Sequence, residues 1–189
     1  MLEKLLHTEG IDIVLREMAQ SWQKLRGGKF QLQYFADHLA EGTSIVKFEV
    51  GEEIKFGEKA VTRVYDIVER SPQDLTHYEL KNWSRWGSWS SKAFRDQFLK
   101  DLATMAKGKT VKWVFSGHKM SREELKRKII KALQDDKWKA QLTSMIQNLS
   151  DKSSLETIFG AEIGDAESLI KAIDEHDAIF DFLFEITNQ

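Results

Sequence analysis

Two carboxylates and one lysine are spaced so that they could meet across a pair of β-strands. Asp66 lies in a strand-like run at residues 64–68, and thirteen residues later comes Glu79, with Lys81 two positions beyond it. Since side chains alternate faces along a strand, Glu79 and Lys81 are expected on one side, and pairing of the strands would bring Asp66 opposite Glu79. Carboxylate oxygens are the ligands that Mg²⁺ and Mn²⁺ prefer. The spacing therefore predicts a divalent-metal site at Asp66 and Glu79.

A cation at this site would polarise a phosphate and lower the pKa of a bound water, and Lys81 would position or deprotonate that water. This is the chemistry of phosphodiester hydrolysis. The alternative for Asp66 is a structural role, as a strand-end carboxylate paired with Arg63 or Arg70. On a regular strand, however, Asp66 shares its face with two valines, where an uncompensated carboxylate is costly to bury. That mismatch favours the catalytic interpretation.

The composition describes a globular protein and limits the chemistry that its sites can use. Of 189 residues, 41% are hydrophobic and 31% are charged. No apolar run approaches the roughly 20 residues that a membrane-spanning helix needs, so no membrane span is expected. Since the chain contains no cysteine, disulfides and cysteine nucleophiles are excluded, and a Zn²⁺ site would have to use His, Asp and Glu.

The net charge of −2 conceals an uneven distribution along the chain. Residues 81–140 carry 16 Lys and Arg against 6 Asp and Glu, whereas residues 141–189 carry 2 against 10. A basic segment directly after the carboxylate–lysine motif is where a polyanionic substrate would need neutralising, although such runs are also common on solvated helix surfaces. The predicted nucleic-acid contacts are Arg85, Trp86, Lys126, Arg127, Lys128 and Lys131.

Periodicity and turn signals give a mixed order of helices and strands. Helices are expected at residues 11–25 and 29–40, separated by Gly27-Gly28, and later at 91–107 and 121–134. Strands are expected at residues 44–50, 60–69, 75–83 and 111–115. This order predicts an α/β (α+β) fold in which a mixed sheet is flanked by helices.

From residue 137 onward the pattern is helical and acidic, and the block at residues 174–184 fits either a helix or a strand. The expected organisation is an N-terminal helical segment at residues 1–27, a core at 28–140 and an acidic, mainly helical extension at 141–189. Three interpretations of the extension stay open: a packed cap on the core, a mask over the basic surface, and a contact for a partner protein.

The element order and the Asp66…Glu79-x-Lys81 arrangement together resemble the PD-(D/E)xK nuclease superfamily, which has the restriction-endonuclease-like fold. More narrowly, the runs at residues 28–34, 79–83, 97–102 and 113–115 look like C-terminal toxin domains of contact-dependent growth-inhibition and related polymorphic toxin systems. The resemblance covers residues 28–135. It departs from the family at Tyr65, where the motif has proline, and on the first helix, where Gln31 and Gln33 replace a glutamate found in many relatives. Glu41 is the nearest acidic substitute.

The resemblance implies a metal-dependent nuclease that cuts DNA or tRNA in the bacterial cytoplasm. It would be delivered into a target cell as part of a larger protein and neutralised by a cognate immunity protein. The resemblance assigns Asp66 and Glu79 to the metal, Lys81 to the catalytic lysine and Gln97 to a polar helper on the following helix. Mg²⁺ or Mn²⁺ is expected first, and Zn²⁺ second. Two alternatives are a nucleic-acid-binding module without catalysis and a protein-interaction module such as an immunity or regulatory partner.

Overall fold

The computed structural model describes residues 2–39, 44–56, 59–72, 74–82, 89–117, 121–149 and 151–187. These residues form a mixed α/β fold around a five-stranded sheet with the strand order β1-β2-β3-β4-β5. β1 (Ile45–Phe56), β2 (Lys59–Arg70) and β3 (Leu75–Lys81) form an antiparallel meander. β4 (Thr110–Ser116) and β5 (Phe184–Thr187) continue the sheet in parallel. The predicted mixed sheet flanked by helices is confirmed.

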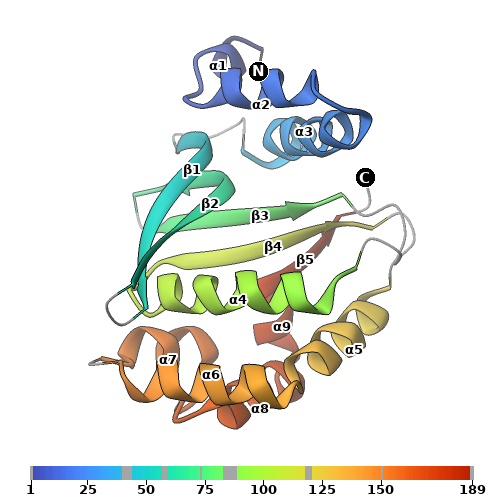
Figure 1. The fold of residues 1–189 in the computed structure, drawn as a ribbon. Helices are drawn as coiled ribbons and strands as arrows, with labels where there is room; N and C mark the ends of the chain where they lie inside the picture. Colours follow the sequence, from blue (N-terminus) through green and yellow to red (C-terminus); the bar gives the residue numbers. More distant parts are fainter. Residues whose placement is uncertain are drawn as a thin grey trace.

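Helices cover the two faces of this sheet (Figure 1). On one face lie α1 (Leu2–Leu6), α2 (Ile11–Met18), α3 (Trp22–Tyr34) and the π-helical turn η1 (Phe35–Leu39). On the other face lie α4 (Ser91–Met105), α5 (Arg122–Leu133), α6 (Asp136–Gln147), α7 (Ser153–Phe159), α8 (Ala166–Glu175) and α9 (Asp177–Leu183). Of these, α4 lies directly against the sheet, and α6, α7 and α8 lie beyond it.

The sheet separates two hydrophobic cores. The larger core lies on the α4 side, where Phe98 of α4 packs with Trp113 of β4 and with Leu169 and Phe180 from the acidic C-terminal helices. The smaller core lies on the α3 side and includes Phe30 and side chains of β1, β2 and β3. Burying one such side chain contributes about 1.5–3 kcal/mol. The acidic C-terminal segment therefore supplies the sheet with a strand and the larger core with buried side chains.

The β1–β2 hairpin changes faces at one point along its length. On β2, Ile67 enters the smaller core, whereas Tyr65, two residues earlier, enters the larger one. Residues two apart share a face on a regular strand, so the alternation is broken between them, at Asp66. β1 has the same break next to Phe48, at Glu49, whose φ of 50° lies in the left-handed region. The distortion thus places two carboxylates side by side on the hairpin.

The N-terminal helices begin and end at other positions than the sequence pattern predicted. α2 ends at Met18, and α3 continues through Gly27 and Gly28, so the predicted break at the glycine pair is wrong. Ser21 begins α3, because its hydroxyl accepts a hydrogen bond from the Lys24 N–H. A Cβ at Gly28 would lie 2.3 Å from Met18 Cγ, so the glycine is what lets α2 approach α3.

The remaining elements follow the sequence pattern closely. The strands predicted around residues 60–69, 75–83 and 111–115 correspond to β2, β3 and β4, while β1 continues past Gly51 to Phe56. The block that fitted either a helix or a strand contains both, since α9 ends at Leu183 and β5 begins at Phe184. Among the helices of the described ranges, none has the length and apolar character needed to cross a bilayer.

Candidate functional site

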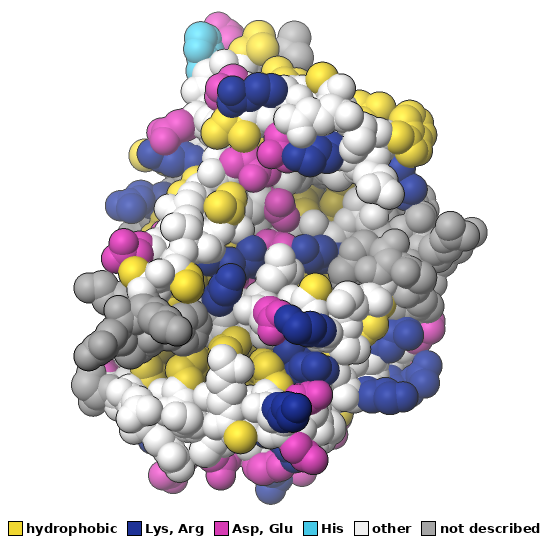
Figure 2. Space-filling view, in the orientation of Figure 1, with side chains coloured by type: hydrophobic (Ala, Val, Ile, Leu, Met, Phe, Trp, Pro, Cys, Tyr) yellow, Lys and Arg dark blue, Asp and Glu magenta, His cyan; other side chains and the backbone are white. Residues whose placement is uncertain are grey.

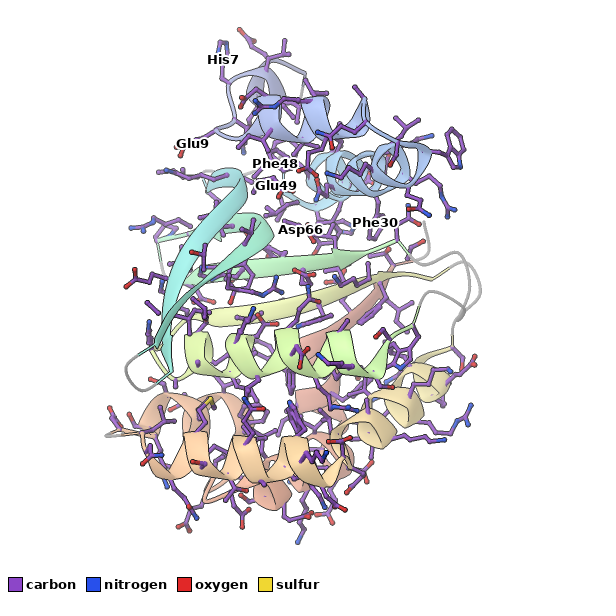
Figure 3. The ribbon with its side chains drawn as sticks, viewed as in Figure 1. His7, Glu9, Phe30, Phe48, Glu49 and Asp66 are labelled. Carbon is purple, nitrogen blue, oxygen red and sulfur yellow. The ribbon has the colours of Figure 1, made fainter. Side chains whose placement is uncertain are left out.

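Asp66 lies where β2 stops pairing with β3. The ladder between the two strands ends at the Ile67–Tyr78 pair, and Asp66 is the next residue along β2. Its side chain, and not its backbone, bonds to β3 here: Oδ2 accepts a hydrogen bond from the Leu80 backbone N–H at 2.6 Å. Figure 3 shows Asp66 and Glu49 in the space between α3 and the sheet.

One glutamine side chain holds these two carboxylates. Gln31, which is buried in α3, donates from Nε2 to Asp66 Oδ1 at 2.8 Å and to Glu49 Oε1 at 3.0 Å. Because both oxygens contact the same nitrogen, the two carboxylates converge on one position. Glu49 was not predicted as a site residue. The sequence carries no signal for it, since a glutamate between Phe48 and Val50 fits the ordinary alternation of a half-buried strand.

The Asp66–Glu49 pair carries more negative charge than its surroundings neutralise. Burial, and next the charge of Glu79, raise the pKa of Asp66 to about 7, against the lowering effect of Lys81 and of the backbone N–H bonded to Asp66. Burial also raises the pKa of Glu49, which the hydrogen bond from Gln31 lowers only in part. A neutral amide cannot offset two negative charges, so this position favours a bound cation. Figure 2 shows acidic side chains gathered below the α2–α3 layer.

Glu79 is held differently, in an ion network on the α4 side of the sheet. Its Oε2 accepts from Arg63 Nη2 at 2.7 Å, and its Oε1 is bonded to Lys81 Nζ. Arg63 Nε also donates to Asp101 Oδ1 of α4 at 2.9 Å, and Trp113 Nε1 donates to Asp101 Oδ2 at 2.9 Å. The predicted shared face of Glu79 and Lys81 is confirmed. Two cations balance two carboxylates here, with the Arg63 side chain only 6% exposed.

Asp66 is covered for other reasons than those predicted from the sequence. Arg63, which was considered as its partner, is bonded to Glu79 and Asp101 instead. The regular strand that would place Asp66 between two buried valines is not formed: Val68 is buried, but Val64 is 44% exposed. Asp66 is half-buried because α3 covers the break in the hairpin, and not because it shares a face with the valines.

Lys81 belongs to the ion network, whereas Gln97 lies one helical turn from it on α4. Lys81 Nζ lies 5.2 Å from the centroid of the Trp113 ring, and its side chain remains 18% exposed. Gln97 precedes Asp101 by one helical turn, which places it on the same side of α4. It is half-buried and makes no hydrogen bond or ion pair with any residue of the described ranges. The structure therefore brings Gln97 next to the network but not into it.

His77 shares the Glu79 face and has a structural role. The ring is fully buried, its Nε2 lies 2.8 Å from Glu52 Oε1, and it packs edge-on against Tyr65 with 4.6 Å between centroids. Glu52 in turn bonds to Lys109. These contacts tie β3 to β1 and to the start of β4, and they occupy the histidine completely.

The predicted nucleic-acid contacts are not gathered at this site. Arg85 and Trp86 lie outside the described residues, as does the acidic substitute Glu41. The other four contacts are on α5, in the helix layer on the far side of the sheet from α3 (Figure 1): Lys126, Arg127, Lys128 and Lys131. Lys126 donates to the Asp174 carbonyl at 2.6 Å and to Asp177 Oδ1 at 2.8 Å. Acidic C-terminal residues therefore already occupy part of this basic helix.

The carboxylates of the site are occupied by N–H donors: the Gln31 amide for Asp66 and Glu49, and Arg63 for Glu79. Across the described ranges, no three His, Asp or Glu side chains are arranged to hold a metal ion. The donor set is nevertheless all oxygen and short of positive charge on the α3 side, which fits a hard divalent cation. No family model, curated protein or solved structure matches this chain.

Proposed function

We propose that this chain is a divalent-metal-dependent endonuclease, acting on DNA or tRNA, with a restriction-endonuclease-like core formed by β1–β4, α3 and α4. One observation carries the proposal: Asp66 and Glu49 share one neutral amide where β2 leaves β3, and the charges of Glu79 and Lys81 act on Asp66. Carboxylates repel a polyanion, so a protein that only binds nucleic acid gains nothing from them there. A nuclease uses such carboxylates to hold a cation against the phosphate.

The residues of the site have distinct roles in this proposal. Asp66 and Glu49 would hold the cation, and these oxygen ligands suit Mg²⁺ or Mn²⁺ better than Zn²⁺. When bound, the ion supplies a Lewis acid for the phosphate and lowers the pKa of water. The Lys81 ammonium, bonded to Glu79, would orient the attacking water by donating a hydrogen bond to it. Gln31 fixes the direction of the Asp66 and Glu49 carboxylates.

Cleavage assays test this assignment directly. Purified protein is incubated with supercoiled plasmid and with total tRNA, in Mg²⁺, Mn²⁺ or Zn²⁺ and in EDTA. Asp66→Asn, Glu49→Gln and EDTA are expected to abolish cleavage, and Gln31→Ala, which removes only an orienting group, to lower it about 10–100-fold. Asp96→Asn is the matched control, because Asp96 is an exposed carboxylate paired with Lys92. Cleavage by Asp66→Asn at the wild-type rate would refute the assignment.

The proposed biological setting is antibacterial. The chain would act in the cytoplasm of a bacterium that receives it as part of a larger protein, and an immunity protein would protect the producer. The resemblance of residues 28–34 and 79–83 to polymorphic-toxin domains supports this setting. Induced expression should arrest bacterial growth, and Asp66→Asn should relieve the arrest while accumulating to the same level. Arrest by the variant would indicate a different activity.

One observation favours a second candidate, a nucleic-acid-binding module without catalysis. Both oxygens of Glu79 are already bonded to cations, Arg63 and Lys81, as in a closed structural network. This candidate predicts nucleic-acid binding that is sensitive to salt but unaffected by EDTA, with no cleavage in any metal. The cleavage assay therefore separates the two.

A further inference from the structure

We infer that a binding site for an unpaired nucleotide lies on α3, next to the carboxylates of the candidate site. The inference rests on the proposed nuclease function and narrows its substrate to strands that offer an unstacked base. The site is a pocket of 440 Å³, and its lining includes Trp22, Leu25, Arg26, Lys29, Phe30 and Asn82. This volume is in the range of small-molecule and cofactor sites.

Trp22 gives the pocket an aromatic surface. It is 72% exposed, which is more than any other large hydrophobic residue of the described ranges, whereas Trp113 and Trp138 are buried in the larger core. Trp22 is the first residue of α3, directly after the Ser21 cap, so its backbone position is fixed. Indole rings stack on any base, because every base has a π face. Figure 2 shows hydrophobic side chains exposed at the edge of the α2–α3 layer.

Two cations stand on the same side of the helix as this ring. Arg26 and Lys29 follow Trp22 by four and seven residues, a spacing that places all three along one face of α3. Lys29 is exposed and forms no ion pair with the described residues. None of the described residues that line the pocket is acidic. The pocket therefore combines an aromatic face with positive charge, which is the chemistry that recognises a base and its phosphate.

The pocket adjoins the candidate site through two neighbouring residues. Asn82 follows Lys81, and its Nδ2 donates to the Arg26 carbonyl at 2.8 Å, which ties the end of β3 to α3. Phe30 precedes Gln31 on α3. A strand with one phosphate at the carboxylates would therefore present a nearby nucleotide to the pocket. A concave pocket admits a base only when that base is not paired within a duplex, so the fit is to a single strand or a loop.

Binding can be measured without cleavage, in EDTA and in an Asp66→Asn background. The probes are fluorescein-labelled 12-nucleotide single strands of RNA and of DNA and the DNA duplex of the same sequence, followed by anisotropy. Tighter binding of single strands than of duplex is expected. Trp22→Ala should weaken single-strand binding about 5- to 100-fold, and Trp22→Phe should keep most of it. Lys29→Ala should reduce the slope of log K against log salt by about 0.7.

Two variants on the other helix layer serve as controls. Lys171→Ala removes an exposed cation of α8, and Phe182→Ala removes an exposed aromatic ring of α9; both should bind like the parent. A preference for RNA over DNA, or equal binding of both, supports the site and defines its sugar requirement. Tighter binding of the duplex, or unchanged binding by Trp22→Ala, would overturn it. Because no cleavage is needed, the pocket and the nuclease assignment succeed or fail separately.

Discussion

Asp66 and Glu79 lie on neighbouring strands, yet their carboxylates are stabilised by groups of different charge. On the α4 side, Glu79 and Asp101 are bonded to the guanidinium of Arg63, and Lys81 completes the balance. On the α3 side, Asp66 and Glu49 share the neutral amide of a single glutamine. Both groups of side chains are partly or wholly buried, so the difference lies in compensation and not in exposure.

This difference distinguishes the structural network on the α4 side from the pair of carboxylates on the α3 side, where we propose that a ligand binds. A cationic partner lowers the pKa of a buried carboxylate, as Arg63 does for Asp101, although burial still leaves the pKa of Asp101 above its ordinary value. A carboxylate whose bonded side-chain partner is a neutral amide lacks this lowering and gains more from an added cation. The raised pKa of Asp66, about 7, is what the second situation predicts. The α4 side therefore positions Glu79 and Lys81, and the α3 side is where we propose that a metal ion binds.

The largest effect is expected from breaking the compensated network. Arg63→Met leaves the buried carboxylates of Glu79 and Asp101 without a cation, which should lower the free energy of unfolding by about 3–5 kcal/mol in urea denaturation. Arg16→Met is the control, because the Arg16–Asp12 pair is exposed and its loss should change the free energy by no more than about 0.5 kcal/mol. If Arg63→Met lowered the free energy of unfolding by less than about 1 kcal/mol, the two sides of the sheet would not differ in charge compensation.

The second-largest effect is expected in the way that the unfolding free energy of the metal-free protein depends on pH. Asp66 has a pKa of about 7 in the folded chain against 3.8 as its ordinary value, so the folded state holds a proton that the unfolded state has lost. Its contribution to stability therefore falls as the pH rises from about 4 to about 7. Between pH 4 and pH 8, the difference in unfolding free energy should shift by about 3–4 kcal/mol in favour of Asp66→Asn over wild type.

The control for the pH experiment is Asp96→Asn, because the Asp96 carboxylate is exposed. The difference in unfolding free energy between this variant and wild type should stay constant over the same pH range. Other groups titrate alike in all three proteins and cancel in the differences. A difference between wild type and Asp66→Asn that does not change with pH would mean that the Asp66 carboxylate is compensated after all.

The smallest effect concerns the helix that presents Gln31. Gly27→Ala should raise the free energy of unfolding by about 0.4–1 kcal/mol, because alanine is the better helix former and nothing lies within 4 Å of the new Cβ. Gly28→Ala should lower it by about 1 kcal/mol, since its Cβ would lie 2.3 Å from Met18 Cγ. Thermal unfolding of the two variants, and of Gly28→Ala combined with Met18→Ala, measures how far α2–α3 packing fixes the site. Equal stability of the two single variants would argue against this packing.

The sequence predicted the elements better than it predicted the site. Strand alternation correctly placed Glu79 and Lys81 on one face, since β3 is a regular strand. The same rule failed for Asp66, because the hairpin is broken there and no local pattern signals the break. Gly28 was predicted to interrupt a helix, but it lies inside α3, because packing against Met18 overrides its low helix propensity.

Residues distant in sequence were the hardest to predict. Gln31, Glu49 and Asp66 meet only because α3 crosses over the break in the hairpin, and periodicity within one segment carries no information about such contacts. The basic helix α5 was expected at the site because it follows the motif in sequence, but it lies in the helix layer on the far side of the sheet from α3, Asp66 and Glu49.

Calorimetric titration of the metal-free protein with Mn²⁺ at pH 7.5 tests the central claim most directly. Wild type should bind one ion, with release of a proton that increases as the pH is lowered towards 6.5, because the ion displaces the proton of Asp66. Asp66→Asn should not bind, Glu49→Gln should bind more weakly, and Asp96→Asn should bind like wild type. Equal binding of Mn²⁺ by wild type and Asp66→Asn, or no binding by wild type, would contradict a metal site at these carboxylates.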